Sequence, residues 1–351
     1  MIEFRIMHII GALLKLDVAD MSHETDFFEA GGNSLLAGAL IAQLEASYGV
    51  HLTLKQILSR STVGEIANAC RVELDTAPEE IIYDFGTGDG SDRIFFVHGR
   101  SGEVYFLQPA IKQSRERNEP LQIAAIRSRG LDGRHEPFIS MADMAAFYVD
   151  KICEFQPAGP YVIAGFCLGG MIAWEVTRQL ISAGHQVSSL LIFDTVPCTD
   201  PLDMEEREQL ISGRHAGIEN LAKAMLPEST TSFSSSPWEE IVAELHAEKL
   251  LPADVTAQDY ERRMQVIGRN LAAFWEYRPE NIGTNVLAVF GPSIDDESRE
   301  YALAQYSKLA SSVEAEIVHS EHDDFFADKT VFDILARENS RDRRDRRRTP
   351  A

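Results

Sequence analysis

Apolar positions along the chain change their spacing near residue 93. Between residues 2 and 73 they recur every three or four positions, which is the spacing of amphipathic helices. One such stripe comprises Ile6, Ile9, Ile10, Leu13 and Leu14, and a second comprises Leu35, Leu36, Ala39, Leu40 and Leu44. From Arg93 onward, short apolar runs alternate with longer helical patterns, which predicts a mostly parallel sheet. The pattern therefore predicts a small helical bundle followed by an α/β domain.

Six runs have the length and apolar content of buried strands. They are 94–97 (IFFV), 122–126 (QIAAI), 161–164 (YVIA), 189–193 (SLLIF), 286–290 (VLAVF) and 313–318 (VEAEIV). Between the fourth and fifth runs, residues 200–278 have helical patterning broken by a Ser-rich stretch, STTSFSSSP. A sheet does not need this insertion. It predicts a helical lid over the strand ends, where open α/β sheets place their ligand sites.

Two further segments differ in composition from both domains. Residues 74–90 are acidic and rich in small residues, which predicts a linker between a domain at 1–73 and a domain at 91–338. Residues 339–351 carry many arginines and few apolar side chains, which predicts a disordered tail.

Composition narrows the function classes. The 351 residues carry a formal net charge of −22, which opposes a nucleic-acid role because phosphate binding needs positive surface. The four cysteines, Cys70, Cys153, Cys167 and Cys198, have neither the number of a disulfide framework nor the spacing of a metal site. Neither a signal-peptide pattern nor an apolar run approaching membrane-spanning length is present. We expect a soluble cytoplasmic protein with no membrane or metal partner.

The stretch DFFEAGGNSLLA (26–37) places Ser34 at the start of an apolar helix, directly after two glycines. A simple helix cap by Asn33 or Ser34 would account for part of this pattern. The full order D-x-F-F-x-x-G-G-x-S-L, with a helix before it and the amphipathic HLTLKQILSRSTVGEIA after it, resembles the acyl- and peptidyl-carrier domains of nonribosomal peptide synthetases and polyketide synthases. The resemblance implies a covalent 4′-phosphopantetheine on Ser34. A phosphate at this position would lie beside the positive end of the helix dipole.

The stretch GFCLGG (165–170) follows an apolar run and precedes a helical pattern. Strand, glycine-flanked turn and helix make the layout of a nucleophile elbow, with Cys167 where serine is usual. A helix N-terminus lowers a thiol pKa, so cysteine is a competent nucleophile there. The alternative is a small buried thiol with a packing role.

A nucleophile of this type needs a base and an orienting acid. His322 lies four residues past the last apolar run, with His319 as the rival that abuts the strand. Asp194 closes the fourth run, whereas Asp295 and Asp296 follow the fifth. Either position gives the chain order nucleophile, acid, histidine, so spacing alone leaves the acid open.

Residues 93–335 resemble the thioesterase domains that terminate nonribosomal peptide synthetases. The resemblance rests on FFVHGRSGEVYFL (95–107), the elbow, LLIFDTVP (190–197) and the late histidine. It implies an α/β-hydrolase fold with Asp194 as the acid. It also implies an oxyanion hole formed by the backbone N–H groups of Leu168 and Arg100, and a structural role for His98.

The two resemblances imply the terminal carrier–thioesterase module of a nonribosomal peptide synthetase. A peptidyl group would move from phosphopantetheinyl-Ser34 to Cys167 and leave by intramolecular cyclisation, with a strained β-lactam or β-lactone favoured by the thioester that cysteine preserves. The implied partners are upstream condensation and adenylation domains, a phosphopantetheinyl transferase and the peptidyl thioester. The alternatives are hydrolytic release of a linear peptide, hydrolytic editing, a serine enzyme with a trapping substitution at Cys167, and a non-catalytic carrier-binding module.

Overall fold

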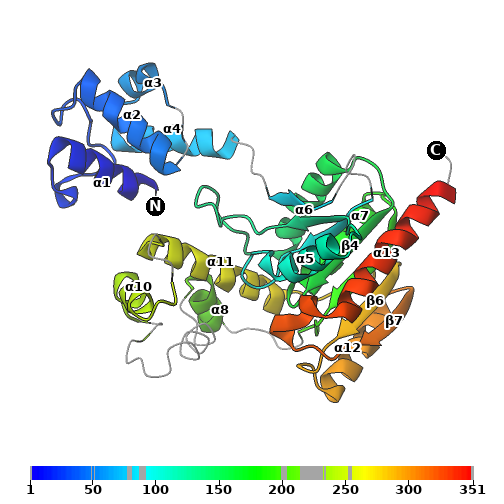
Figure 1. Cartoon of the computed structure of the whole chain (residues 1–351). Coiled ribbons are helices and arrows are strands. Elements are labelled where there is room, and N and C mark those ends of the chain that lie inside the picture. Colours follow the sequence, from blue (N-terminus) through cyan, green and yellow to red (C-terminus); the bar gives the residue numbers. More distant parts are fainter. Residues whose placement is uncertain are drawn as a thin grey trace. The chain divides into compact units, whose positions relative to one another are not determined.

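The computed structural model describes residues 2–48, 50, 52–76, 81–86, 92–198, 204–213, 232, 235–251 and 255–348. The chain folds as two compact units that divide near residue 80. Figure 1 shows the helical unit in blue and the α/β unit in cyan to red. Nothing in the described part of the chain forms a helix both long and apolar enough to cross a membrane.

The first unit is a bundle of α1 (Ile2–Leu14), α2 (Ser34–Tyr48), α3 (Leu54–Ser59) and α4 (Val63–Thr76), with a short 3₁₀ turn at Val18–Asp20. Its core is apolar and includes Ile6, Ile10, Leu40, Leu44 and Ile66. Leu35 departs from the predicted stripe, since 83% of it is exposed. It lies in the first turn of α2, at the N-terminal end of the helix, and is not part of the apolar core.

The second unit contains, among the described residues, a seven-stranded sheet in the order β1-β3-β2-β4-β5-β6-β7. The strands β2 (Ile94–Val97), β3 (Ile123–Ile126), β4 (Tyr161–Phe166), β5 (Val187–Phe193), β6 (Asn285–Phe290) and β7 (Ser312–Ile317) are parallel. The chain order reverses direction across the sheet at β2, which has β3 on one side and β4 on the other. Open α/β sheets form their ligand crevice at such a switch point, beyond the carboxyl ends of the strands.

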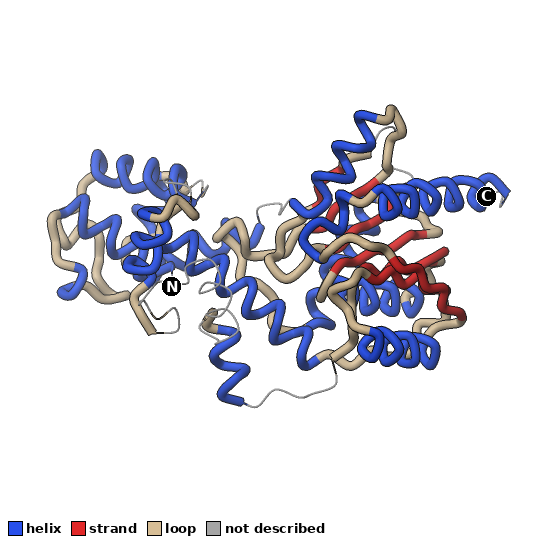
Figure 2. Tube along the Cα trace, turned by 60° about the horizontal axis from the view of Figure 1, so that its bottom comes forward, coloured by secondary structure: helices blue, strands red, loops and turns tan. Residues whose placement is uncertain are grey.

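Helices cover both faces of the sheet (Figure 2). One face packs against α6 (Met141–Phe155), α7 (Gly169–Ser182) and α12 (Asp296–Leu309), and its core contains Tyr148, Trp174 and Tyr306. The other face packs against α5 (Gln108–Glu116) and α13 (Lys329–Arg348), with Leu107 and Phe332 in its core. This three-layer arrangement confirms the predicted α/β-hydrolase fold class.

The predicted linker is shorter than the sequence indicates. The strand β1 (Ile82–Asp84) lies inside residues 74–90 and pairs antiparallel with β3. Arg93, which is 1% exposed, donates to Asp84 over 2.7 Å and to Gln122 over 2.6 Å. An edge strand of three residues, only partly buried, leaves almost no apolar periodicity, so composition alone assigned it to the linker.

The C-terminal segment also differs from its prediction. The helix α13 continues to Arg348, so residues 339–348 are helical where a disordered tail was predicted. Asn339 is 6% exposed, and its side chain accepts from the Gln122 N–H (3.0 Å) and donates to the Gln122 carbonyl (3.2 Å). Arginine is a good helix former, and a helix already docked on the sheet needs no further apolar side chains to continue.

The lid segment contributes α8 (Met204–Ile211), α10 (Trp238–Ala247) and α11 (Ala257–Glu276), between β5 and β6. Most of the Ser-rich stretch lies outside the described residues. Trp238 of α10 packs edge-on against Tyr260 of α11. Gly268 of α11 lies against Leu210 of α8 so closely that an added Cβ would sit 1.6 Å from the Leu210 carbonyl oxygen.

Candidate active site

Cys167 occupies a strained turn between β4 and α7. Its φ of +56° lies in the left-handed region that residues other than glycine rarely adopt. Its N–H donates to the Phe193 carbonyl (3.0 Å), and its carbonyl accepts from Thr195 Oγ1 (2.6 Å). The turn also brings backbones together, since a Cβ on Gly165 would lie 2.1 Å from the Gly169 carbonyl oxygen. These contacts fix Cys167 above the carboxyl end of β4.

The structure brings His322 and Asp194 together with Cys167. His322 begins the 3₁₀ helix His322–Ala327, and its Nδ1 lies 2.5 Å from Asp194 Oδ2. The Cys167 side chain lies near enough to His322 to help raise the pKa of the imidazole. Phe166, the residue before the cysteine, stacks on the imidazole at a centroid distance of 4.4 Å. Three segments distant in sequence therefore place the hydrogen-bonded pair of His322 and Asp194 beside Cys167.

Asp194 is held by more than the histidine. It follows β5 with a φ of +49°, and its side chain is 1% exposed. One carboxylate oxygen accepts from the Gly291 N–H (2.9 Å), and the other accepts from Ser293 Oγ (2.8 Å) as well as from His322. The loop after β6 thus supplies donors that orient the carboxylate.

These contacts set the charge of the pair. Burial raises the pKa of Asp194, but hydrogen bonds from His322, Gly291 and Ser293 outweigh it and keep that pKa below its usual value of 3.8. The hydrogen bond to Asp194, and after it the Cys167 side chain, raises the pKa of His322 to about 10. The geometry therefore favours an ionised carboxylate beside an imidazole that takes up a proton readily.

The rival residues have other contacts. Asp295 caps α12 by accepting from the Ser298 N–H (2.7 Å), and Asp296 pairs with Arg299. His319 is exposed. His98 is fully buried, with Nε2 2.7 Å from the Tyr148 hydroxyl, and burial lowers its pKa to about 4. None of these contacts involves Cys167.

The two backbone N–H groups expected to form the oxyanion hole, those of Leu168 and Arg100, lie in two different loops. Leu168 directly follows Cys167 and precedes α7. Arg100 lies in the turn after β2, and its carbonyl accepts from Asn270 Nδ2 of α11 (3.2 Å). The strands β2 and β4 are neighbours in the sheet, so these two loops leave it side by side.

In the helical unit, Ser34 is the first residue of α2. Asn33 accepts from the N–H groups of Leu35 and Leu36, both at 3.0 Å. Asn33 therefore caps the helix, and the exposed Ser34 hydroxyl is not required for that purpose.

Comparison with known families agrees with both units. Residues 5–70 match the family of phosphopantetheine attachment sites, and residues 94–247 match the thioesterase domain family. The chain is a carrier protein–thioesterase didomain. The attachment-site family indicates that the didomain carries covalently attached 4′-phosphopantetheine, and an exposed serine at a helix N-terminus suits that phosphate.

The relatives of the didomain are much longer proteins. Indigoidine synthase of Streptomyces lavendulae is 29% identical over 184 residues, which cover 49% of this chain and 13% of that protein. A dimodular nonribosomal peptide synthase of Bacillus subtilis (strain 168) is 29% identical over 171 residues, which cover 49% of this chain and 7% of that protein. The didomain thus spans a small part of their length.

A solved structure shares the fold of the didomain. It is holo-AB3403, a four-domain nonribosomal peptide synthetase bound to AMP and glycine, with a TM-score of 0.58 and 23% identity. The similarity covers 97% of this chain and 26% of that one.

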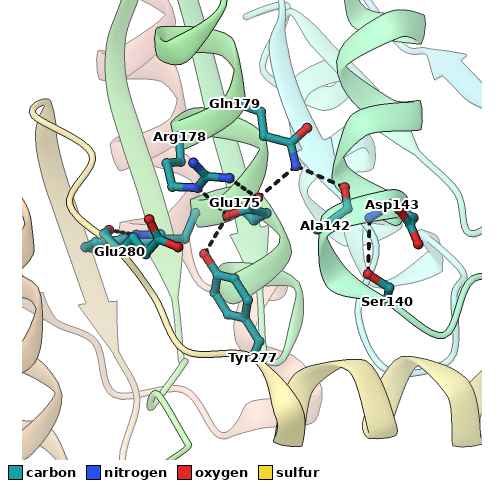
Figure 3. A network of polar contacts seen from close by, with 9 residues as sticks. Ser140, Ala142, Asp143, Glu175, Arg178, Gln179, Tyr277 and Glu280 are labelled. Atoms are coloured by element: carbon teal, nitrogen blue, oxygen red, sulfur yellow. Dashed lines mark hydrogen bonds and ion pairs between the residues drawn. The ribbon is translucent and has the colours of Figure 1, made fainter.

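A buried carboxylate that the sequence did not indicate joins α7 of the didomain to its lid segment (Figure 3). Glu175 of α7 is 2% exposed and accepts from Arg178, Gln179 and the hydroxyl of Tyr277, which directly follows α11. Gln179 also donates to the carbonyl of Ala142, which lies in the first turn of α6. The C-terminal end of α11 is therefore anchored to the helix that begins beside Cys167.

Sequence reasoning also missed the residues that contact His322, Asp194 and the loop after β2. Phe166 reads as one more apolar strand residue, and Ser293 lies two residues before the aspartates that were weighed as the acid. Asn270 reads as a polar interruption in an amphipathic helix. Each makes its contact through tertiary structure, so a single sequence offers no periodic signal for it.

Proposed function

We propose that Ser34 bears the 4′-phosphopantetheine arm of the didomain and that Cys167 accepts an acyl group from this arm. The hydrogen bond between His322 and the buried Asp194, beside the left-handed turn of Cys167, is the observation that supports this proposal. A buried thiol with a packing role would not need a left-handed backbone conformation and an imidazole oriented by a buried carboxylate.

The residues divide the reaction among them. When attached, the arm supplies a terminal thiol that carries the acyl group as a thioester. Cys167 Sγ attacks the acyl carbonyl carbon, while His322 takes the thiol proton and returns it to the departing thiol. Asp194 holds the Nδ1 side of the imidazole and stabilises the imidazolium.

Negative charge develops on the carbonyl oxygen during the attack. We assign the N–H groups of Leu168 and Arg100 as the donors that stabilise it. Both lie in loops that leave neighbouring strands at the carboxyl edge of the sheet. Fixed donors at this position stabilise the transition state more than the ground state.

We further propose that the acyl group is a peptide and that it leaves by intramolecular cyclisation, with a β-lactam or β-lactone as the favoured product. An acyl group on Cys167 remains a thioester, so its activation survives the transfer. A strained ring needs that activation, whereas hydrolysis does not. In this proposal the didomain works at the end of a nonribosomal peptide synthetase, after condensation and adenylation domains, and a phosphopantetheinyl transferase modifies Ser34.

Intact-mass measurements on the full chain test the transfer. A phosphopantetheinyl transferase and an acyl-coenzyme A should add one acylated arm to the wild type and to Ser59→Ala, a control on the same unit. Ser34→Ala should gain no mass. Cys167→Ala should load but keep its acyl group, while the wild type releases it. Loading that persists in Ser34→Ala, or release that continues in Cys167→Ala, would overturn the assignment.

A further inference from the structure

One helix of the lid segment contacts the loop that follows β2 through a buried amide. Asn270 of α11 is 1% exposed, and its Nδ2 donates to the Arg100 carbonyl over 3.2 Å. Its Oδ1 is buried and has no hydrogen-bond partner among the described residues. Burying an unpaired amide oxygen costs free energy, so stability alone does not account for asparagine at this position.

A second contact lies one helical turn earlier. Val266 is fully buried on the same face of α11 as Asn270, since residues four apart share a face. It packs against Gly102, where an added Cβ would sit 2.9 Å from Val266 Cγ1. Gly102 has a φ of +78° and donates its N–H to the Gly99 carbonyl, which closes a tight turn around Arg100. The helix thus contacts the turn on both sides of Ser101.

The turn from Gly99 to Gly102 contains the N–H that we assign to the oxyanion hole. The direction of that N–H depends on the backbone conformation of the turn, and Asn270 holds the carbonyl of the same residue, Arg100. We propose that Asn270 is a positioning residue that makes the oxyanion hole depend on the seating of α11. The inference rests on the proposed acyl transfer to Cys167.

The coupling has a functional consequence. When α11 is seated, Asn270 and Val266 hold the turn with its N–H available to a developing oxyanion. When α11 is displaced, the turn loses both contacts and the donor loses its fixed direction. The oxyanion hole would then be complete only when the lid has closed over an acyl group. While the site is open to water, acylation would be slow because the oxyanion lacks one fixed donor.

Two reactions of the same thiol separate this role from a general structural one. Acylation by hexanoyl-N-acetylcysteamine forms a carbon–sulfur bond to Cys167, breaks the thioester bond and releases N-acetylcysteamine with a proton from His322. It passes through an oxyanion. Alkylation by iodoacetamide displaces iodide and forms none. Both rates are measured on the full chain by peptide mapping at Cys167.

Asn270→Leu keeps much of the volume but removes the donor. It should slow acylation about tenfold to a hundredfold, as expected for a misplaced transition-state group, and change alkylation less than about twofold. Arg263→Ala, an exposed position on α11, should change neither rate. Equal losses in both reactions, or no loss in acylation, would overturn the positioning role. A wild type that is not acylated at Cys167 would instead overturn the proposed function on which it rests.

Discussion

The ring of Phe166 lies over the imidazole of His322, with centroids 4.4 Å apart and an interplanar angle of 26°. The electron-rich face of an aromatic ring favours a neighbouring cation. Phe166 therefore adds to two other causes that favour the imidazolium: the hydrogen bond that His322 donates to Asp194, and the Cys167 side chain. Because Phe166 also precedes Cys167, one dipeptide fixes the position of the Cys167 thiol and one face of the His322 imidazole.

Replacement of Phe166 with Leu should lower the pKa of His322 by about half a unit to one unit, the equivalent of a partly exposed cation–π contact. Phe106→Leu is the matched control, because the Phe106 ring contacts Phe166 and Phe326 and makes no described ring contact with His322. NMR titration of the His322 ring protons measures both variants. An unchanged titration in Phe166→Leu, or an equal shift in the control, would assign the stack to packing alone.

Asp194→Asn should lower the pKa of His322 further, toward 6.5, because it removes the largest cause of the shift. It should also reduce kcat by about a hundredfold to ten-thousandfold, since the amide no longer holds the imidazole in its working orientation. Asp295→Asn keeps a side-chain oxygen that can accept from the Ser298 N–H, so it should leave both quantities near wild type. The opposite order of kcat values would show that the acid follows β6.

The same pKa has a consequence for stability. Its folded value lies above the ordinary 6.5, so the stabilisation from the His322 imidazolium is fully present below about pH 6.5 and is lost as the pH rises through about 10. In Asp194→Asn this loss should still begin near pH 6.5, the ordinary value, but it should be smaller and end at lower pH. Thermal unfolding across that range, followed in both proteins, measures the difference.

The C-terminal helix contributes to stability up to Asn339. Asn339→Ala should lower the free energy of unfolding by about 1–3 kcal/mol, because it removes the side-chain acceptor of the buried Gln122 N–H and one of the two donors to the Gln122 carbonyl, which keeps the Ile94 N–H (2.8 Å). Ser340→Ala, at the next and exposed position, should cost much less. Deletion of residues 341–351 should change the melting temperature little, whereas deletion from Asn339 should be destabilising. Equal melting temperatures for the two truncations would contradict a role for Asn339.

The limits of sequence reading follow from what each pattern encodes. Buried parallel strands are near-continuous apolar runs, so β2, β4 and β6 were predicted to within two residues. The exposed edge strand β1 and the arginine-rich end of α13 lack that signal. Asp194 and Asp295 each follow a strand, and spacing cannot separate them. Their difference is tertiary: one carboxylate is buried against His322, while the other caps α12.

Cys167→Ser tests why the site uses sulfur. Serine suits the same elbow and accepts activation by His322, so this variant should still form an acyl-enzyme from a synthetic peptidyl-pantetheine substrate. Its ester is an oxoester, which is less activated than a thioester. Intramolecular closure to a strained ring should therefore slow, and the acyl-enzyme should accumulate or hydrolyse to a linear acid. Mass spectrometry of protein and product follows both steps, with Cys167→Ala as the control that forms no acyl-enzyme. A serine variant that gave the same cyclic product at the wild-type rate would remove the thioester argument, and a wild type that gave only linear acid would replace cyclisation with hydrolysis.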